Sequence, residues 1–296
     1  APEKISRTWF RLLRRIFDLR LRWCPTYEER DRVMALYAPL ALLSLLPIWL
    51  LIVALGFAAL YWATGVESQM EDLILSGSSL LTLGFARGNS LIHDLLAFGE
   101  ATLGLILVAI LIAYLPTMYG AFARRESAVS RLAVRANTPP SALEFILRAN
   151  RINELENLRD FWQEWEIWFA EVAESHTSLA ALVFFRSPDP YHSWITASGT
   201  VLDTAALMLS TVDVPDQPQA ALCIRAGYLA LQAIADFFRI TYHSAPTFPA
   251  VPISIARTEF DELCRALTAA GVPLKPDLDQ AWHDFGGWRV NYDRTL

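Results

Sequence analysis

Charge is missing from two long stretches of the sequence. No Asp, Glu, Lys or Arg occurs from Val33 to Val66, and none occurs from Ala101 to Ala123. About 20 apolar residues suffice for a helix to cross the hydrocarbon core of a bilayer. Both stretches exceed that length, which excludes an ordinary soluble domain and predicts two transmembrane helices, at about 35–63 and 98–122.

Cysteine is also scarce. The chain has 3 cysteines, at positions 24, 223 and 264, and they show neither CxxC nor metal-ligand spacing. We therefore expect reduced structural thiols and no disulfide framework. The histidines at 176, 192 and 243 show no metal spacing either, so we expect no metal beyond a permeating ion.

Motifs that carry enzyme chemistry are absent. The sequence has no P-loop, no G-x-S-x-G elbow and no G-x-G-x-x-G after a predicted strand. We expect no enzyme activity and no cofactor. An Arg-rich voltage-sensing span does not precede the first apolar stretch. The net charge is −6, and because the N-terminal arm is basic while the rest is acidic, it says little about partners; we expect no nucleic acid.

Basic residues flank the apolar stretches on one side only. Several precede the first stretch and four closely follow the second, whereas Arg87 is the only Lys or Arg between them. Because cytoplasmic loops carry the excess of Lys and Arg, we expect both termini in the cytoplasm. The chain is then a multi-pass protein of the cell inner membrane, with residues 67–95 outside.

Residues 1–32 form the first predicted domain, a basic amphipathic helix. Apolar residues recur every three or four positions through 4–23, and arginines occupy the opposite side. Such a helix beside a span lies in the membrane interface with its arginines near anionic lipid. The alternative is a cytoplasmic helix packed on the C-terminal domain.

The pore-domain prediction, residues 33–125, depends on the segment between the two stretches. Acidic residues at 67, 71 and 72 suit a helix start, and Met70, Leu73, Ile74, Gly77 and Leu81 give one apolar face. This helix has half the length of a span. Non-helical backbone at membrane depth requires surrounding protein or a water-filled cavity, so we expect about 68–88 to re-enter as a short helix followed by an extended segment.

Residues 126–296 are predicted to be a helical cytoplasmic domain. Ser141 and Glu144 have capping-box spacing, and further helices are expected at about 191–212 and 217–241, with the last helix at about 253–270. The segment 220–240 is long enough to cross a membrane, but it carries Arg225 and Asp236, so we interpret it as a buried bundle helix. The tryptophans at 162, 165 and 168 are expected to form a packing stripe and not a ligand cage.

The sequence LILSGSSLLTLGF resembles the pore helix and filter of a bacterial two-transmembrane potassium channel-like family. Within it, Thr82-Leu83-Gly84-Phe85 is similar to the filter core Thr-Val-Gly-Tyr-Gly, and LAFGEATLGLILVAILIAYLP resembles the family's inner helix. The resemblance covers about 35–125. It implies an all-α membrane protein with two transmembrane helices and a re-entrant pore helix and filter per subunit. It also implies a homotetramer and ion binding by Thr82, Leu83, Gly84 and Phe85.

The chemistry of these residues fits that expectation. Rings of backbone carbonyls replace the hydration shell of K⁺, Gly84 permits torsions that a side chain forbids, and Thr82 adds a ring of hydroxyls. Leu83 and Phe85 are expected to pack against the pore helix. Gly104 and Pro116 are candidates for a gate or hinge, with ordinary packing as the equal alternative.

Two residues at the filter mouth depart from the family. Ala86 replaces the second filter glycine, and a left-handed conformation there costs roughly 1–2 kcal/mol per residue. Arg87 replaces an acidic residue. Four such charges about 7 Å from a cation oppose it by about 2.4 kcal/mol in water before salt screening, unless Glu100 or Asp94 pairs with Arg87.

From these residues we expect passive conduction by a potassium-like cation channel whose selectivity is left open. The alternative is a non-conducting membrane scaffold or sensor that retains the channel frame, with Ala86 and Arg87 marking an inactive filter.

Overall fold

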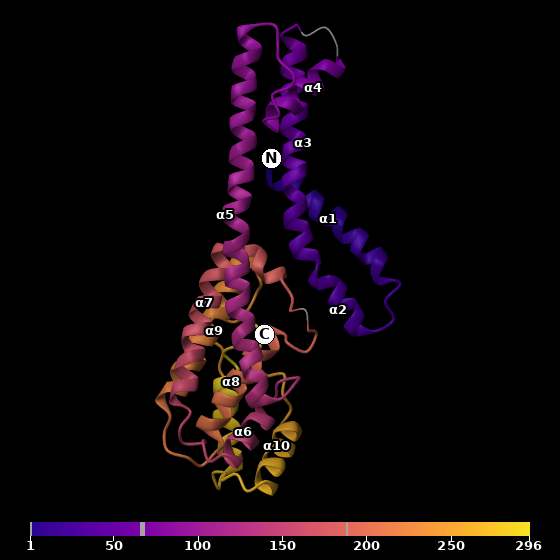
Figure 1. The fold of residues 1–296 in the computed structure, drawn as a ribbon. Helices are drawn as coiled ribbons and strands as arrows, with labels where there is room; N and C mark the ends of the chain where they lie inside the picture. Colours follow the sequence, from indigo (N-terminus) through magenta and orange to yellow (C-terminus); the bar gives the residue numbers. More distant parts are fainter. Residues whose placement is uncertain (1, 66–68, 188) are drawn as a thin grey trace. The chain divides into compact units, whose positions relative to one another are not determined.

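A computed structural model describes residues 2–65, 69–187 and 189–296. Apart from one β-bridge between Val212 and Leu274, the regular structure of these residues is helical (Figure 1). The chain divides into two compact units, Ala1–Gly120 and Ala121–Leu296.

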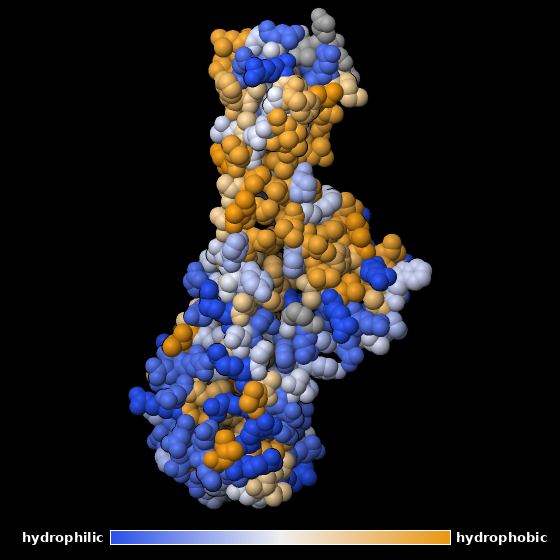
Figure 2. Space-filling view, viewed as in Figure 1, coloured by the Kyte–Doolittle hydropathy of each residue, from blue (hydrophilic) through white to orange (hydrophobic). Residues whose placement is uncertain are grey.

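The first unit holds five helical segments. They are α1 (Pro2–Leu21), α2 (Tyr27–Ala35), α3 (Tyr37–Ala63), α4 (Gln69–Leu80) and the first part of α5 (Leu91–Ala136). The α3 helix agrees with the first predicted span, and α5 contains the second. Both are long and apolar enough to cross a membrane, and the face drawn in Figure 2 is mainly apolar over this unit.

The α1 helix packs against the start of α3. The indole nitrogen of Trp9 donates to the hydroxyl of Ser44 at 2.7 Å, and the Tyr37 hydroxyl donates to the carbonyl of Phe10 at 3.0 Å. These contacts leave another face of α1 uncovered. Its exposed apolar side chains recur at helical spacing, at Leu12, Ile16 and Leu19, and the exposed Trp23 follows in the turn after the helix.

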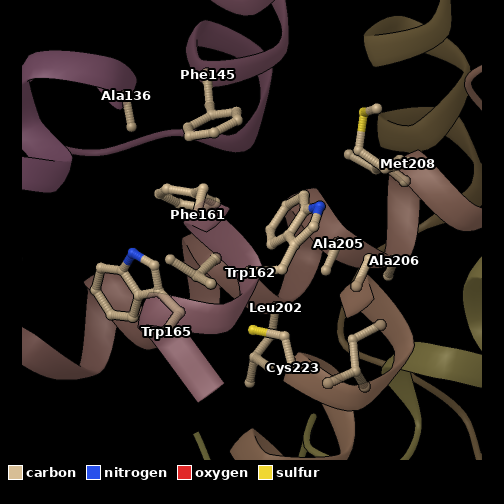
Figure 3. Close-up of a cluster of buried hydrophobic side chains, with 14 of the residues drawn as sticks. Ala136, Phe145, Phe161, Trp162, Trp165, Leu202, Ala205, Ala206, Met208 and Cys223 are labelled. Atoms are coloured by element: carbon tan, nitrogen blue, oxygen red, sulfur yellow. The ribbon is translucent and has the colours of Figure 1, made fainter. Parts of the chain in front are cut away.

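The second unit is a helical bundle around one core. Besides the end of α5 it contains α6 (Ala142–Arg151), α7 (Arg159–Ser178), a 3₁₀ turn η1 (Ala180–Phe184), α8 (Trp194–Ser210), α9 (Pro218–Phe238), α10 (Arg257–Ala269) and α11 (Leu278–Arg289). Figure 3 shows the aromatic side chains of α7 facing small residues of α8 and α9. Trp162, Trp165 and Trp168 are all buried, which confirms the predicted packing stripe.

Two local expectations for this unit are wrong. Ser141 does precede α6, but its side chain makes no capping hydrogen bond. The helix predicted at 253–270 is not the last, because α11 follows it. The Asp277 side chain starts α11 by accepting hydrogen bonds from the backbone nitrogens of Asp279 and Gln280.

The α9 helix is a third helix long and apolar enough to cross a membrane. Its surroundings differ from those of α3 and α5. Of its most apolar 18-residue stretch, 39% is buried inside the chain, whereas the share is 11% for each of the other two. The buried side chains face α7 and α8. Its exposed positions include Arg225 and Asp236.

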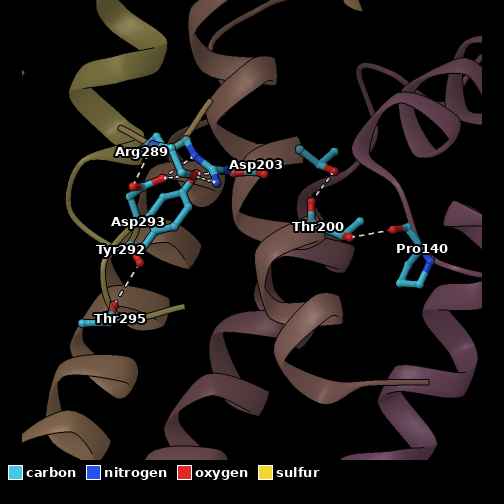
Figure 4. A network of polar contacts seen from close by, with 9 residues as sticks. Pro140, Thr200, Asp203, Arg289, Tyr292, Asp293 and Thr295 are labelled. Carbon is cyan, nitrogen blue, oxygen red and sulfur yellow. Dashed lines mark hydrogen bonds and ion pairs between the residues drawn. The ribbon is translucent and has the colours of Figure 1, made fainter. Parts of the chain in front are cut away.

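A polar network ties α11 to α8 (Figure 4). The Arg289 guanidinium forms ion pairs with Asp203 and Asp293, and the Tyr292 hydroxyl donates to Asp203 at 2.9 Å. The carboxyl of Asp293 also holds Ser254. Because these groups are largely removed from water, loss of one partner would leave a buried charge without compensation.

A second buried arginine fixes α5 to the bundle. Arg125 donates to the carbonyls of Leu182 at 3.1 Å and Phe185 at 2.7 Å, and it forms an ion pair with Glu126. It also contacts Nε2 of His176 at 3.1 Å. Burial, together with the adjacent Arg125 charge, lowers the pKa of His176 to about 4. His176 is therefore neutral, with Nε2 accepting from Arg125 and Nδ1 facing the Val172 carbonyl at 2.9 Å.

This contact predicts a pH-dependent stability. Between pH 6.5 and 4 the unfolded chain protonates His176 while the folded chain does not, so the stability falls as the pH falls. We expect this group to remove about 2 kcal/mol of unfolding free energy between pH 7.5 and pH 5. Urea unfolding in detergent, followed by tryptophan fluorescence, measures the change.

The matched variant is His176→Gln, which keeps an acceptor for Arg125 and has no titratable ring. At each pH, the unfolding free energy of this variant is subtracted from that of the native chain. The difference no longer contains the contribution of the other titrating groups. Equal pH slopes for the two proteins would show that His176 is not held neutral by this contact.

Candidate functional site

The α4 helix is a half-length helix between two span-length helices. Its 12 residues rise about 18 Å, well short of a bilayer core. The face predicted to be apolar is the exposed one, at Met70, Leu73, Ile74 and Leu81. The buried face is mixed, with Asp72, Ser76 and Ser78 beside Leu75 and Leu80. The predicted apolar face of α4 is therefore turned away from its own chain.

The segment after α4 is held by the last turn of the helix. Residues 83–88 form neither helix nor strand. The carbonyl of Ser78 accepts from the backbone nitrogen of Leu83 at 2.8 Å, and its hydroxyl accepts from that of Ala86 at 3.1 Å. The backbone nitrogen of Thr82 donates to the carbonyl of Ser79 at 3.0 Å. Several N–H groups of the segment are therefore turned toward α4.

The carbonyl oxygens of the same segment are unused. Among the described residues, no hydrogen-bond donor meets the carbonyls of Thr82, Leu83, Gly84 or Phe85. The backbone is left-handed at Gly84, with φ +73°, and at Thr82, with φ +55°. Gly84 adopts this freely, whereas the branched Thr82 is strained by about 1–2 kcal/mol.

The expected strain at Ala86 is not observed. Ala86 has no positive φ, and its N–H is satisfied by Ser78. The unfavourable torsion of this segment therefore lies at Thr82, and Ala86 occupies its position without the penalty that the missing glycine predicts.

The side chains of Leu83 and Phe85 are not covered by α4 of their own chain. Leu83 is 61% exposed and Phe85 is 69% exposed. The predicted packing against a pore helix is therefore absent within one chain. Together with the outward apolar face of α4, these side chains form exposed apolar surface that a partner would have to cover.

A hollow of about 550 Å³ separates the segment from the first turns of α5. Ser78, Thr82, Gly84 and Arg87 line one side, and Asp94 and Phe98 line the other. Arg87 and Asp94 are both exposed and form no ion pair. The expected pairing of Arg87 with Glu100 or Asp94 is thus not made by the described residues of one chain.

Glu100 instead belongs to a buried polar layer that joins three helices. Its carboxylate accepts from the Tyr61 hydroxyl of α3 at 3.1 Å and from the Ser76 hydroxyl of α4. Ser76 also lies 2.9 Å from the carbonyl of Ala54. All three side chains are fully buried. The layer fixes α4 between α3 and α5, and with it the segment that α4 carries.

Two further buried polar residues lie in the same unit. His93 contacts the Thr64 hydroxyl at 3.1 Å and accepts from the backbone nitrogen of Asn89 at 3.3 Å, which ties the end of the loop to α3. Asp72 is buried, and neither carboxylate oxygen has a partner among the described residues. Sequence reasoning missed this layer, although acidic residues beside long apolar stretches were its signal.

Gly104, a candidate hinge, has a packing role. A Cβ built there would overlap the carbonyl oxygen of Leu80, the last residue of α4. The glycine thus lets α5 approach the end of α4 closely. The α5 helix also continues through Pro116, so neither residue interrupts it.

We expect Gly104→Ala to destabilise the chain by about 1–3 kcal/mol, because a backbone oxygen cannot move aside without displacing α4. Gly99→Ala is the matched control: it lies on the same helix, and nothing approaches its added methyl within 4 Å. Chemical unfolding in mixed micelles, followed by circular dichroism, measures both. Equal stability of the two variants would contradict the close contact between Gly104 and Leu80.

Comparison with protein-family models, with curated proteins and with solved structures finds no match. The chemistry available to this site therefore has to be inferred from its own geometry. That geometry is a short helix, a segment with unused carbonyl oxygens and two flanking helices long enough to cross a membrane.

Proposed function

We propose that this chain is one subunit of a homotetrameric channel that conducts monovalent cations passively. The observation that carries the proposal is the row of unused carbonyl oxygens from Thr82 to Phe85. Carbonyl rings of this kind replace the hydration shell of a permeating ion. No cofactor and no chemical step is needed.

In this proposal α3 and α5 cross the bilayer of the inner membrane, and α9 does not. Arg225 and Asp236 occupy exposed positions of α9, where a lipid-facing helix would place apolar residues. Both termini then lie in the cytoplasm, in agreement with the basic residues that flank the two spans.

The exposed apolar surface supports a tetramer. A single segment presents oxygens from one side only, so several copies are needed to surround an ion. In an assembly about a common axis, Leu83 and Phe85 of one copy are covered by α4 of the next. The unpaired carbonyls then meet the ion on the axis and not hydrocarbon.

The α1 helix is proposed to lie on anionic lipid. Its exposed apolar side chains are Leu12, Ile16 and Leu19, and Arg11 and Arg15 are exposed on the same helix. The exposed Arg22 and Trp23 follow in the turn after it. This combination is typical of helices that lie in the membrane interface.

A non-conducting scaffold or sensor is the second candidate. It is favoured by Arg87, which is exposed beside the segment without an ion-pair partner among the described residues. Four such charges at a filter mouth repel cations. In this alternative the frame of a channel is retained and its conduction is lost.

Ion flux from the purified protein in liposomes distinguishes the candidates. We expect K⁺ flux above that of protein-free liposomes, and Na⁺ flux measured in parallel gives the selectivity. Arg87→Asp should raise K⁺ flux about tenfold at 0.15 M salt, because a screened repulsion becomes an attraction. Ala86→Gly should raise it as well, by making the upper segment more adaptable.

Gly84→Ala is the negative control, because a side chain is strained at φ +73°. It should lower the flux of the native protein. An absence of flux from the native chain and from both Arg87→Asp and Ala86→Gly would overturn the channel proposal in favour of the scaffold.

A further inference from the structure

An exposed aromatic surface lies at one end of the second unit. We define it as the aromatic edge, formed by Phe184, Phe237, Phe238 and Ile240. Phe184 is 56% exposed, Phe237 is 50% exposed and Ile240 is 55% exposed. The ring of Phe238 meets Phe184 edge-on at 6.2 Å and Phe237 at 5.1 Å, so three aromatic side chains form one patch.

The aromatic edge is at the end of the unit where α5 enters it. The C-terminal ends of α7 and α9 lie at that end of the bundle in Figure 1. Arg125 of α5 donates to the carbonyls of Leu182 and Phe185, which places η1 at the level of Arg125. The rings of Phe122 and Phe185 are 5.7 Å apart.

This position coincides with the end of an uncharged stretch. Phe122 belongs to the run 101–123 that lacks charged residues. If that run crosses the hydrocarbon core, Phe185 touches a residue of the span itself. Phe184 then lies at the boundary between hydrocarbon and headgroups, because it directly precedes Phe185 in the chain.

The charges beside the aromatic edge also suit this boundary. Arg124 is exposed on α5, and Arg239 is exposed at the C-terminal end of α9. The acidic group nearest to Phe237 in sequence, Asp236, accepts a hydrogen bond from the Tyr242 hydroxyl at 3.0 Å. Aromatic rings with flanking arginines are the composition found at membrane–water interfaces.

We propose that the aromatic edge is a lipid-binding surface that rests in the bilayer interface beside the Ala123 end of α5. The second unit is then attached to the membrane at two places, through α5 and through the rings of Phe184 and Phe237. The inference requires that α5 crosses the membrane, and it does not require conduction, so failure of the flux experiment leaves it standing.

Site-directed spin labelling tests the proposal in the whole chain reconstituted in phosphatidylcholine–phosphatidylglycerol liposomes. Phe184→Cys and Phe237→Cys carry the label, and Ile240→Cys repeats the test at a position without a ring contact. Ile152→Cys is the matched control, because Ile152 is also an exposed apolar residue but lies at the end of α6, near the contact between Asn150 and Ala270. The native cysteines are buried, and the unsubstituted chain measures their background labelling.

Accessibility to oxygen, which concentrates in hydrocarbon, is compared with accessibility to a water-soluble nickel complex. We expect the ratio of oxygen accessibility to nickel accessibility to be at least threefold higher for labels at 184, 237 and 240 than for the label at 152. Equal ratios at all four positions would overturn the proposal. Protection of the edge labels from both reagents would overturn it too, because it would show that protein covers the edge, either a second copy or another segment of this chain.

Discussion

A peptide group inside a bilayer has no water to bond with, so its N–H and C=O groups need hydrogen-bond partners within the protein. This requirement shapes the first unit. The α3, α4 and α5 helices satisfy it within themselves. The segment after α4 satisfies it on one side only, since Ser78 and Ser79 engage its N–H groups while its carbonyl oxygens stay open. In the proposed tetramer, an ion and the three other copies of the chain would provide the partners that these oxygens lack within one chain.

The polar layer behind the segment follows from the same requirement. Glu100 is buried among apolar helices and is bonded to hydroxyl groups of Tyr61 and Ser76. Buried polar groups that are fully bonded specify one arrangement of the helices that carry them. The layer and the glycine contact at Gly104 act together, because one fixes the position of α4 and the other fixes how closely its end approaches α5.

Much of the fold follows from the sequence because its signals are strong and local. Uncharged stretches predict α3 and the apolar part of α5, and helical periodicity predicts α1 and the tryptophan stripe of α7. The missed features depend on contacts between distant residues. The α11 helix is short and of mixed polarity, Glu100 meets partners from α3 and α4, and the outward turn of the apolar face of α4 depends on which of two faces its neighbours cover.

The candidate site shows the same division. The sequence shows that Thr82 and Gly84 belong to the segment, but it does not show the backbone torsions there. The sequence predicts strain at Ala86, whereas the structure has the strained torsion at Thr82. The anchoring role of Ser78 is similarly hidden, because SGSS offers three equivalent hydroxyls and only tertiary placement selects one.

The shortness of α4 has an electrical consequence. A helix of about 18 Å and a return segment, residues 83–88, that spans at most about 20 Å occupy little more than half of a 30 Å core. In the proposed tetramer the remaining depth is a wide, aqueous vestibule of low resistance. The membrane voltage then falls mainly across the narrow segment, so a dehydrated ion crosses most of the electric field while moving past only a few carbonyl groups.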